Sequence, residues 1–347
     1  MTSNISEKLD IILITFNRAK KLDETLAQIL SFNSPIRDYS IKILDNDSTD
    51  NTREIVEKYQ KDFPNLKYEK NKYNVGGNAN IVNAFLSADK EYVWVLADND
   101  TYSWDGWEEV IKAMGNNNDA IFVSNSHSPQ KDIACLFLQA TFVPGVIYNT
   151  SLFDSALVQN MYYNVSNMFP HLAIFSKVIN ENKKYTIVQK QIVIAQKNDD
   201  YVGGVSFIRI PHSGVHKYML EMSWFAGYAN SLMFIEDKDK RNYIATHTSD
   251  LHTSLNDTDE MFRWNSYYNN SLYNLFCIWL ALPYNDRIGL FTKYLLKLPR
   301  KTLLKYSVIV LRILFKGIFI SKEYFEQNGQ KRLIVRIFGI KFKFKVK

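Results

Sequence analysis

The sequence has little cysteine and lacks several well-known catalytic patterns. Cys135 and Cys277 are its only cysteines, which excludes a disulfide framework or a cysteine metal set and favours a reducing compartment. No apolar stretch precedes the first predicted strand, so we expect no secretory signal. The patterns Gly-x-x-x-x-Gly-Lys-Ser/Thr, His-Glu-x-x-His and Gly-x-Ser-x-Gly do not occur. The sequence therefore gives no sign of a P-loop, a zinc-protease helix or a hydrolase nucleophile elbow.

The chain is rich in apolar and aromatic residues, and its charge is unevenly distributed. Of 347 residues 46% are hydrophobic, with 21 Tyr and 22 Phe, enough for one large core or two smaller ones. The net charge is +6, but residues 284–347 hold 16 Lys or Arg against three acidic residues and carry +13. The remaining 283 residues therefore carry −7. A basic tail on an acidic body indicates an anionic partner surface.

Apolar runs alternate with segments of helical periodicity in the first 110 residues. Runs rich in β-branched residues predict strands at 9–15, 40–44, 66–69 and 92–97, and the helices between them are predicted at 21–30, 51–59 and 81–87. Such alternation predicts a doubly wound, mostly parallel α/β sheet with flanking helices. Later runs at 120–124, 135–138 and 185–195 predict further strands.

Polar residues follow the end of each early strand or lie in the glycine loop before the fourth. These groups are Thr15-Phe16-Asn17, Asp45 to Ser48, Gly76-Gly77 and Asp98-Asn99-Asp100. In open α/β sheets such loops meet in one crevice at the carboxyl ends of the strands. An aromatic ring, carboxylates, a glycine loop and two hard oxygen donors together suit a nucleotide diphosphate with a divalent cation. Taken singly, each loop is also compatible with ordinary turn chemistry.

The same residues resemble a known family. Ile-Leu-Ile-Thr-Phe-Asn-Arg, Ile-Leu-Asp-Asn-Asp-Ser-Thr-Asp-Asn-Thr, Asn74-Val-Gly-Gly-Asn-Ala-Asn-Ile-Val-Asn83 and Leu-Ala-Asp-Asn-Asp look, in order and spacing, like the N-terminal half of a family 2 glycosyltransferase of GT-A fold. The resemblance covers residues 8 to 155 well and the rest poorly. It implies a nucleotide-sugar donor, usually inversion at the anomeric carbon, and Mn²⁺ or Mg²⁺ bound through the Asp-x-Asp motif.

The resemblance also implies roles for single residues. Phe16 matches the base-stacking aromatic, Asp98 the ribose-facing carboxylate and Asp100 the metal ligand, with Asp98 beside it. The expected donor-binding set is Thr15, Phe16, Asn17, Arg18, Asp45, Asn46, Gly76, Gly77, Asn80, Asn83, Asp98 and Asn99.

Three positions depart from the family pattern. Asn46 stands where a second carboxylate is usual, so the base (uracil, thymine or cytosine) stays open. Val82 replaces a frequent Arg, so one diphosphate contact must come from elsewhere, and Asn80 is the candidate. The family often places an acidic base in a Glu-Asp pair of the acceptor half, 111–215, and we identify no such pair after residue 110, which leaves the catalytic base to His171, with Asp154 as the weaker alternative. Imidazole titrates near neutrality and suits a base, but His171 at the start of an apolar helix also fits a core or capping role.

The C-terminal region predicts membrane association. At 100° per residue, Lys301, Lys305, Arg312 and Lys316 fall within a stripe of roughly 60° on an otherwise apolar segment, as in an interfacial helix. Packing of this stripe on the enzyme body is the alternative. Residues 331–347 predict two short strands around Gly339, one face charged and one apolar. No nucleic-acid recognition motif is present, so we expect no nucleic-acid partner.

These observations lead to one principal hypothesis. We expect a metal-dependent inverting glycosyltransferase, a hexosyltransferase, that uses a UDP, dTDP or CDP sugar and a glycan or lipid-linked acceptor in surface-glycan synthesis. A GT-A domain is expected over 1–215 (donor half 1–110, acceptor half 111–215), followed by a helical, basic region over 216–347. We expect a cytoplasmic protein, peripheral on the cytoplasmic membrane face. The alternatives are a sugar nucleotidyltransferase and a non-catalytic nucleotide-binding module at the membrane surface.

Overall fold

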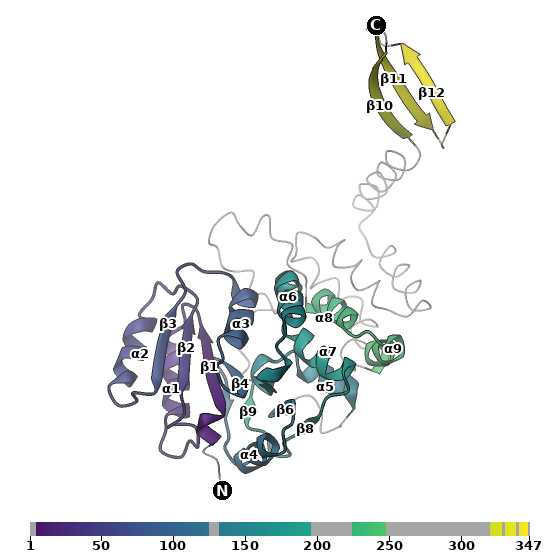
Figure 1. Cartoon of the computed structure of the whole chain (residues 1–347). Helices are drawn as coiled ribbons and strands as arrows, with labels where there is room; N and C mark the ends of the chain where they lie inside the picture. Colours follow the sequence, from purple (N-terminus) through teal and green to yellow (C-terminus); the bar gives the residue numbers. More distant parts are fainter. Residues whose placement is uncertain are drawn as a thin grey trace, which may run out of the picture. The chain divides into compact units, whose positions relative to one another are not determined.

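The computed structural model describes residues 5–124, 132–195 and 224–247, and the backbone of three C-terminal strands over 320–327, 330–337 and 340–345. The chain divides into two compact units, Met1–Arg287 and Ile288–Lys347. Each unit is described by itself, and Figure 1 labels their elements.

Most strands of the first unit form one mixed sheet. Its described strands are β1 (Leu9–Thr15), β2 (Ile41–Asp45), β3 (Leu66–Lys70), β4 (Tyr92–Ala97), β5 (Thr101–Tyr102), β6 (Ala120–Phe122), β7 (Val146–Asn149), β8 (Tyr185–Ile187) and β9 (Val193–Ile194). Seven of them lie in the order β3-β2-β1-β4-β7-β6-β8, and β5 pairs with β9 separately. The first four run parallel, β7 is antiparallel to β4 and β6, and β8 runs parallel to β6. The predicted α/β class with a mostly parallel sheet is confirmed.

Helices cover both faces of this sheet. The described helices of this unit are α1 (Ala19–Ile29), α2 (Thr52–Gln60), α3 (Gly77–Leu86), α4 (Trp107–Gly115), α5 (Ile133–Gln139), α6 (Ser155–Tyr163), α7 (Leu172–Asn180), α8 (Trp224–Ser231) and α9 (Lys238–His247), of which α9 packs against α5. None of the helices in the described ranges has the length and apolar content that a bilayer crossing requires.

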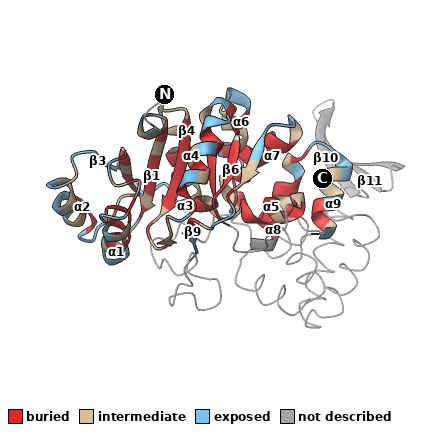
Figure 2. Cartoon of the chain, turned by 90° about the horizontal axis from the view of Figure 1, so that it is seen from below, coloured by how far each residue is buried: buried red, intermediate tan, exposed pale blue. Residues whose placement is uncertain are grey.

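The central strand β4 explains how the core is built. Tyr92 to Leu96 are all buried, as expected for a parallel strand covered on both faces. Alternate residues point to opposite faces: Trp94 joins the cluster that holds Leu26 of α1, Val56 of α2 and Val110 of α4. The contacts of α3 with β1 and β4 place that helix on the other face. Figure 2 shows the buried residues concentrated in these central strands and in the helix faces turned toward them.

Three element predictions were wrong. Residues 135–138 are not a strand but lie in α5, because the Asp132 carboxylate caps that helix by accepting a hydrogen bond from Ala134 N (2.7 Å). A short apolar run fits a buried helix or a strand equally well. The single strand predicted over 185–195 is two short strands in different sheets, β8 and β9. Helix α3 begins at Gly77, four residues before its predicted start at Ile81.

The second unit contains an antiparallel three-stranded sheet. Its strands are β10 (Ile320–Gln327), β11 (Gln330–Ile337) and β12 (Ile340–Lys345). The two strands predicted around Gly339 are therefore present. Directly opposed residues share a face, and the register pairs Arg332 with Lys345, Ile334 with Lys343 and Arg336 with Lys341. Five of these six residues are cationic. Leu333, Val335 and Ile337, opposed to Phe344, Phe342 and Ile340, occupy the other face.

Candidate active site

Three parallel strands bring their polar carboxyl ends together. Thr15 is the last residue of β1, Asp45 ends β2, and Asp98 follows β4 directly. The register pairs Thr15 with Asp45 and Ile14 with Ala97, so the three ends lie side by side. All three polar residues are buried. Buried polar side chains therefore lie at the edge of the sheet at which ligands bind in α/β folds.

Asp98 is held from two sides. Thr15 Oγ1 donates to its Oδ2 (2.7 Å), and Arg18 Nη1 donates to its Oδ1 (3.0 Å). Burial raises the pKa of Asp98, and the positive charge of Arg18 and the hydrogen bond from Thr15 act in the opposite direction. Arg18 Nη1 also reaches Asn99 Oδ1 (3.5 Å). Asp98 is thus an anchor that joins the β1 loop to the Asp-Asn-Asp segment.

Asp100 lies two residues after Asp98 in the sequence and is also buried. Burial raises the pKa of Tyr102 well above its ordinary value, and the negative charges of Asp100 and Asp98 add to this effect. Among the described residues no group of three or more His, Cys, Asp or Glu side chains could hold a metal alone. Two neighbouring carboxylates still fit Mg²⁺ or Mn²⁺, because Mg²⁺ commonly takes one or two protein carboxylates and completes its shell with substrate phosphates and water.

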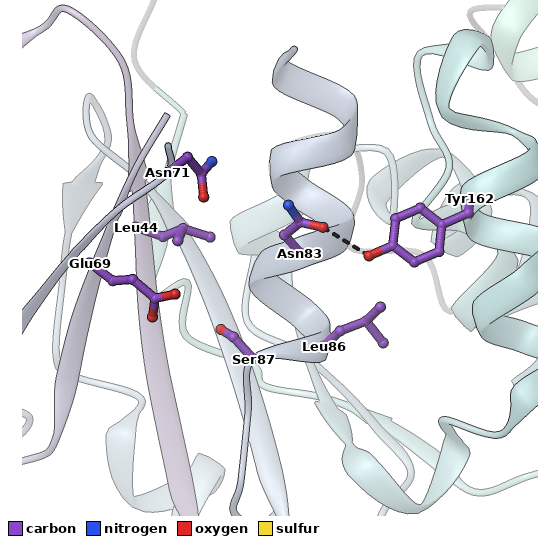
Figure 3. Close-up of a pocket in the computed structure, with 7 residues that line it drawn as sticks. All are labelled: Leu44, Glu69, Asn71, Asn83, Leu86, Ser87 and Tyr162. Carbon is purple, nitrogen blue, oxygen red and sulfur yellow. Dashed lines mark hydrogen bonds between the residues drawn. The ribbon is translucent and has the colours of Figure 1, made fainter. Parts of the chain in front are cut away.

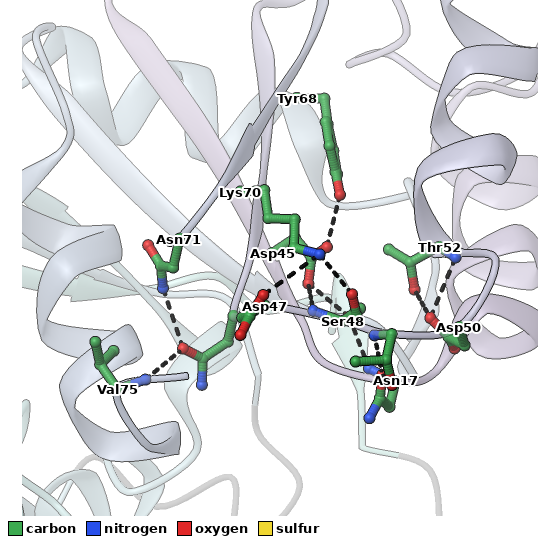
Figure 4. Close-up of polar contacts among 12 residues, drawn as sticks. Asn17, Asp45, Asp47, Ser48, Asp50, Thr52, Tyr68, Lys70, Asn71 and Val75 are labelled. Atoms are coloured by element: carbon green, nitrogen blue, oxygen red, sulfur yellow. Dashed lines mark hydrogen bonds and ion pairs between the residues drawn. The ribbon is translucent and has the colours of Figure 1, made fainter. Parts of the chain in front are cut away.

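Asp45 is buried, and both oxygens of its carboxylate are bonded within the protein. Its Oδ1 accepts hydrogen bonds from Ser48 N (2.9 Å) and Ser48 Oγ (2.5 Å), and its Oδ2 accepts one from Tyr68 Oη (2.6 Å). Burial and the bond to Asp45 together raise the pKa of Tyr68. Figure 4 shows these contacts around the loop after β2. The structure gives Asp45 a role in shaping that loop.

The loops after β1 and β2 are tied to each other. Asn17 N donates to Ser48 Oγ (2.8 Å), and Asn17 Oδ1 accepts from Thr49 N (2.7 Å). Asn17 has φ 51°, a conformation that asparagine tolerates better than most residues. Asp50 accepts from Ala19 N (3.0 Å) and Thr52 Oγ1 (2.6 Å) and so links the starts of α1 and α2.

Two further predicted donor-binding features are Phe16 and the glycine loop at Gly76-Gly77. Phe16 is half-buried, and among the described aromatic rings none stacks on it. Gly76 has φ 86°, and a Cβ there would meet nothing within 4 Å, so its backbone conformation is what requires glycine. Gly77 begins α3, whose first turn has no side-chain cap. The backbone N–H groups at such a helix start suit an anion.

Asn80 and Asn83 lie one turn apart on α3 and have different hydrogen-bond partners. Asn80 is buried, and its Oδ1 accepts from Asn71 Nδ2 (2.8 Å). Asn83 lies further along α3, and its Oδ1 accepts from Tyr162 Oη (2.9 Å) beside a hollow of about 230 Å³. Figure 3 shows this hollow between α3, β2, β3 and α6. Its lining residues are Leu44, Glu69, Asn71, Asn83, Leu86, Ser87 and Tyr162.

The two candidate bases both have structural partners. His171 is 2% exposed, its Nε2 is 3.1 Å from the carbonyl oxygen of Thr141, and burial lowers its pKa to about 4. Asp154 caps α6 by accepting from Leu157 N (2.8 Å) and forms an ion pair with Lys177. Its hydrogen bonds with Leu157 and Lys177 lower its pKa. These environments favour a buried packing role for His171 and a capping role for Asp154, and both assignments as base stay predictions.

The expectation that no Glu-Asp pair follows residue 110 was wrong, because Glu236 and Asp237 form one. Both residues are exposed and lie immediately before α9. Asp237 Oδ1 accepts from Asp239 N (2.9 Å) and Lys240 N (3.0 Å), and the bond from Lys240 N lowers the pKa of Asp237. The structure therefore gives Asp237 the geometry of a helix cap.

Comparison with known proteins defines the class. Over 97% of its length the chain resembles the crystal structure of S. aureus TarS residues 1–349 in complex with UDP-GlcNAc, at TM-score 0.55 and 17% identity, covering 99% of that chain. Its mostly parallel sheet and flanking helices are those of the GT-A fold. The model of the family described as glycosyl transferase family 2 matches residues 10–182. The chain belongs to glycosyltransferase family 2.

Curated relatives are similar over shorter stretches. A GalNAc(5)-diNAcBac-PP-undecaprenol beta-1,3-glucosyltransferase of Campylobacter jejuni is 36% identical over 94 residues, 27% of this chain and 30% of that protein. The poly(ribitol-phosphate) beta-N-acetylglucosaminyltransferase TarP of Staphylococcus aureus is 27% identical over 182 residues, 51% of each chain. The chain thus spans between about a third and a half of the length of these relatives.

Proposed function

We propose that the protein is a metal-dependent inverting glycosyltransferase that moves a sugar from a nucleotide-diphosphate donor to a hydroxyl of a glycan or lipid-linked acceptor. The observation that carries this proposal is the hydrogen bond between Thr15 and Asp98 at the carboxyl edge of the parallel sheet, where Asn46 links Thr15 to the loop before Gly76. Family membership and the likeness to a sugar-nucleotide-bound structure support it.

Each part of the edge has a chemical task in this proposal. The half-buried ring of Phe16 offers a face for the base. Arg18 keeps about 39% of its side chain exposed beside Asp98, so its guanidinium can also bind diphosphate oxygens. The uncapped start of α3 supplies backbone N–H donors to the same phosphates. Asn80 is committed to Asn71, so Arg18 replaces it as the diphosphate contact in this proposal.

Asp100, with Asp98 beside it, would hold Mn²⁺ or Mg²⁺ against the donor diphosphate. When bound, the cation would neutralise charge on the leaving diphosphate. Asp98 is kept in place by Thr15 and Arg18, so this carboxylate is positioned before any ligand arrives. Such preorganisation avoids rearrangement of the site during the reaction.

The relatives guide the choice of donor and acceptor. The Campylobacter relative is named for a diphosphoundecaprenol-linked glycan, and the staphylococcal relative for poly(ribitol-phosphate). We therefore propose a UDP-type hexose or hexosamine donor and an acceptor of bacterial surface-glycan type. We further propose a GT-A domain over 1–215 and an accessory region over 216–347. The family match ends at residue 182, inside the proposed catalytic domain.

A ligand screen tests the function directly. We expect UDP, and a UDP-sugar in the presence of Mn²⁺, to raise the melting temperature of the full chain. A ligand at 100 times its Kd stabilises a fold by about 2.7 kcal/mol. UMP, uridine and the GDP, CDP and dTDP series report which part of the donor is recognised. The proposed function fails if neither nucleoside diphosphates nor nucleotide sugars cause a shift with Mn²⁺ or Mg²⁺.

We propose that the second unit binds an anionic membrane surface. Support comes from the β11–β12 register, which places Arg332, Arg336, Lys341, Lys343 and Lys345 on one face. Each cation near an anionic leaflet contributes about 1 kcal/mol. The basic stripe predicted over 301–320 lies outside the described residues apart from Ile320.

Charge reversal in the full chain tests this membrane role. We expect Lys341→Glu, Lys343→Glu and Lys345→Glu together to weaken binding to phosphatidylglycerol vesicles on the order of 100-fold. Phosphatidylcholine vesicles should bind neither form. The exposed lysines of the first unit, changed together as Lys20→Glu, Lys61→Glu and Lys67→Glu, give the same charge change as a control. Equal co-sedimentation of the β12 variant and this control would contradict the proposal.

A further inference from the structure

Asn46 stands at the centre of a hydrogen-bond network that crosses four segments. Asn46 N donates to the carbonyl oxygen of Thr15 (3.0 Å). Its side-chain Oδ1 accepts from Asn71 Nδ2 (3.0 Å) and Val75 N (3.0 Å), and its Nδ2 donates to Asn74 Oδ1 (2.9 Å). Figure 4 labels Asn71 and Val75, which both donate to this oxygen. The side chain is 3% exposed, so its polar groups are used inside the protein.

Two backbone donors fix which way the side-chain amides face. Val75 N can only donate, so the atom of Asn46 that it contacts must be oxygen. Gly76 N donates to Asn74 Oδ1 (2.8 Å) and fixes that oxygen in the same way. Asn46 Nδ2 therefore faces an acceptor. A carboxylate at position 46 would place two acceptors against each other, which explains an amide at a position where the family pattern led us to expect an acid.

The network ends at the glycine loop and at α3. Asn71 Nδ2 also donates to Asn80 Oδ1 (2.8 Å) in the first turn of α3, and Asn71 N donates to the carbonyl oxygen of Asp45 (2.8 Å). Asn74 holds Gly76, whose positive φ sets the entry into the helix. Residues 71–76 are thus fixed by Asn46 on one side and by α3 on the other.

We propose that Asn46 is a positioning residue that holds the 71–76 loop and the start of α3 in the geometry that receives the donor diphosphate. In this arrangement Asn46 does not read the base, because the residue is 3% exposed, its oxygen accepts two hydrogen bonds and its Nδ2 donates to Asn74. The inference rests on the proposed function, since it assumes that the diphosphate lies at the start of α3. Weakening the network would then lower the affinity for every nucleoside diphosphate alike.

A matched pair of substitutions isolates this role. Asn46→Asp and Asn74→Asp each add one negative charge to the same hydrogen-bond network. Asn74 joins the network through its Oδ1, which accepts from Asn46 Nδ2 and Gly76 N, so a carboxylate in the N74D variant keeps both contacts. The N46D variant instead loses the donor that faces Asn74. We expect Kd for UDP, measured by calorimetry, to rise at least tenfold more in N46D than in N74D.

Two further readouts separate positioning from base recognition and from general destabilisation. We expect N46D to weaken UDP, CDP, dTDP and GDP by the same factor and to leave uridine binding unchanged. Amide exchange in residues 71–77 should accelerate in N46D and stay slow in N118D. Asn118 is a buried asparagine in the loop after α4, and its side chain donates a hydrogen bond to the carbonyl oxygen of Ala113 (2.8 Å).

The outcomes distinguish this inference from the proposed function. If the wild-type chain binds UDP but N46D and N74D bind it equally, the positioning role is wrong. A loss confined to one base in N46D would make Asn46 a base-reading residue and would also overturn the inference. Unchanged exchange of residues 71–77 in N46D would overturn it without any ligand. Failure of the wild-type chain to bind any nucleotide would instead reject the proposed function.

Discussion

Replacing Asp100 with alanine is expected to lower the rate of sugar transfer about 1,000-fold, equivalent to about 4 kcal/mol of transition-state stabilisation. Asp100 is buried directly after the central strand, beside an Asp98 that Thr15 and Arg18 already hold. Removing its carboxylate would leave the proposed cation one protein ligand fewer. The measurement is kcat for sugar transfer over a range of Mn²⁺ concentrations.

Asp105→Ala is the control for this substitution. Asp105 is an exposed acidic residue in the same segment, outside the strand-end cluster. We expect the D105A variant to keep wild-type turnover and Mn²⁺ dependence. Thermal unfolding of both variants verifies that each is folded. Full turnover by a folded D100A variant would reject Asp100 as a metal ligand.

The fold is expected to lose stability in mild acid because of His171. Burial lowers the pKa of His171 to about 4, whereas an unfolded histidine titrates near 6.5. Between these values the unfolded chain binds the proton and the folded chain does not, so protonation favours unfolding. The contribution of His171 is complete above about pH 6.5 and is lost as pH falls toward 4. A shift of this size corresponds to about 3 kcal/mol in the free energy of unfolding.

His171→Gln provides the measurement. Gln has no titrating group, and its Nε2 can still donate to the Thr141 carbonyl oxygen that His171 contacts. We expect urea unfolding of H171Q to vary less between pH 7 and pH 5 than unfolding of the wild type. His247→Gln, at an exposed histidine of α9, should leave the dependence unchanged. Unchanged stability combined with loss of transfer in H171Q would instead favour His171 as the base.

Long apolar runs made the early strands predictable, and short runs did not. Residues 9–15 and 92–97 are strands as expected, because a strand buried on both faces needs a nearly continuous apolar segment. The run at 135–138 was too short to distinguish helix from strand, and the Asp132 cap decided for a helix. The first turn of α3 was missed because its asparagines and glycines have weak helix propensity.

The candidate site was likewise only partly predictable from the sequence. The polar residues at the strand ends predicted which edge of the sheet carries the candidate site. Their residue types did not indicate which of them form hydrogen bonds within the protein. Asp45 and Asn46 were expected to contact the nucleotide, yet Tyr68, Asn71 and Asn74 occupy their polar atoms. Those partners lie 23 or more residues away along the chain. No local spacing pattern could have indicated these contacts.

The sequence by itself determined the α/β class, the polar residues that follow the central strands, and the family. Periodicity and motif spacing, on which these predictions rest, are local properties of the chain. Only the tertiary structure decided which of these polar groups form hydrogen bonds within the protein. Burial and hydrogen bonding between distant segments set that partition: Asp45 and Asn46 are engaged within the fold, and His171 is enclosed with a lowered pKa.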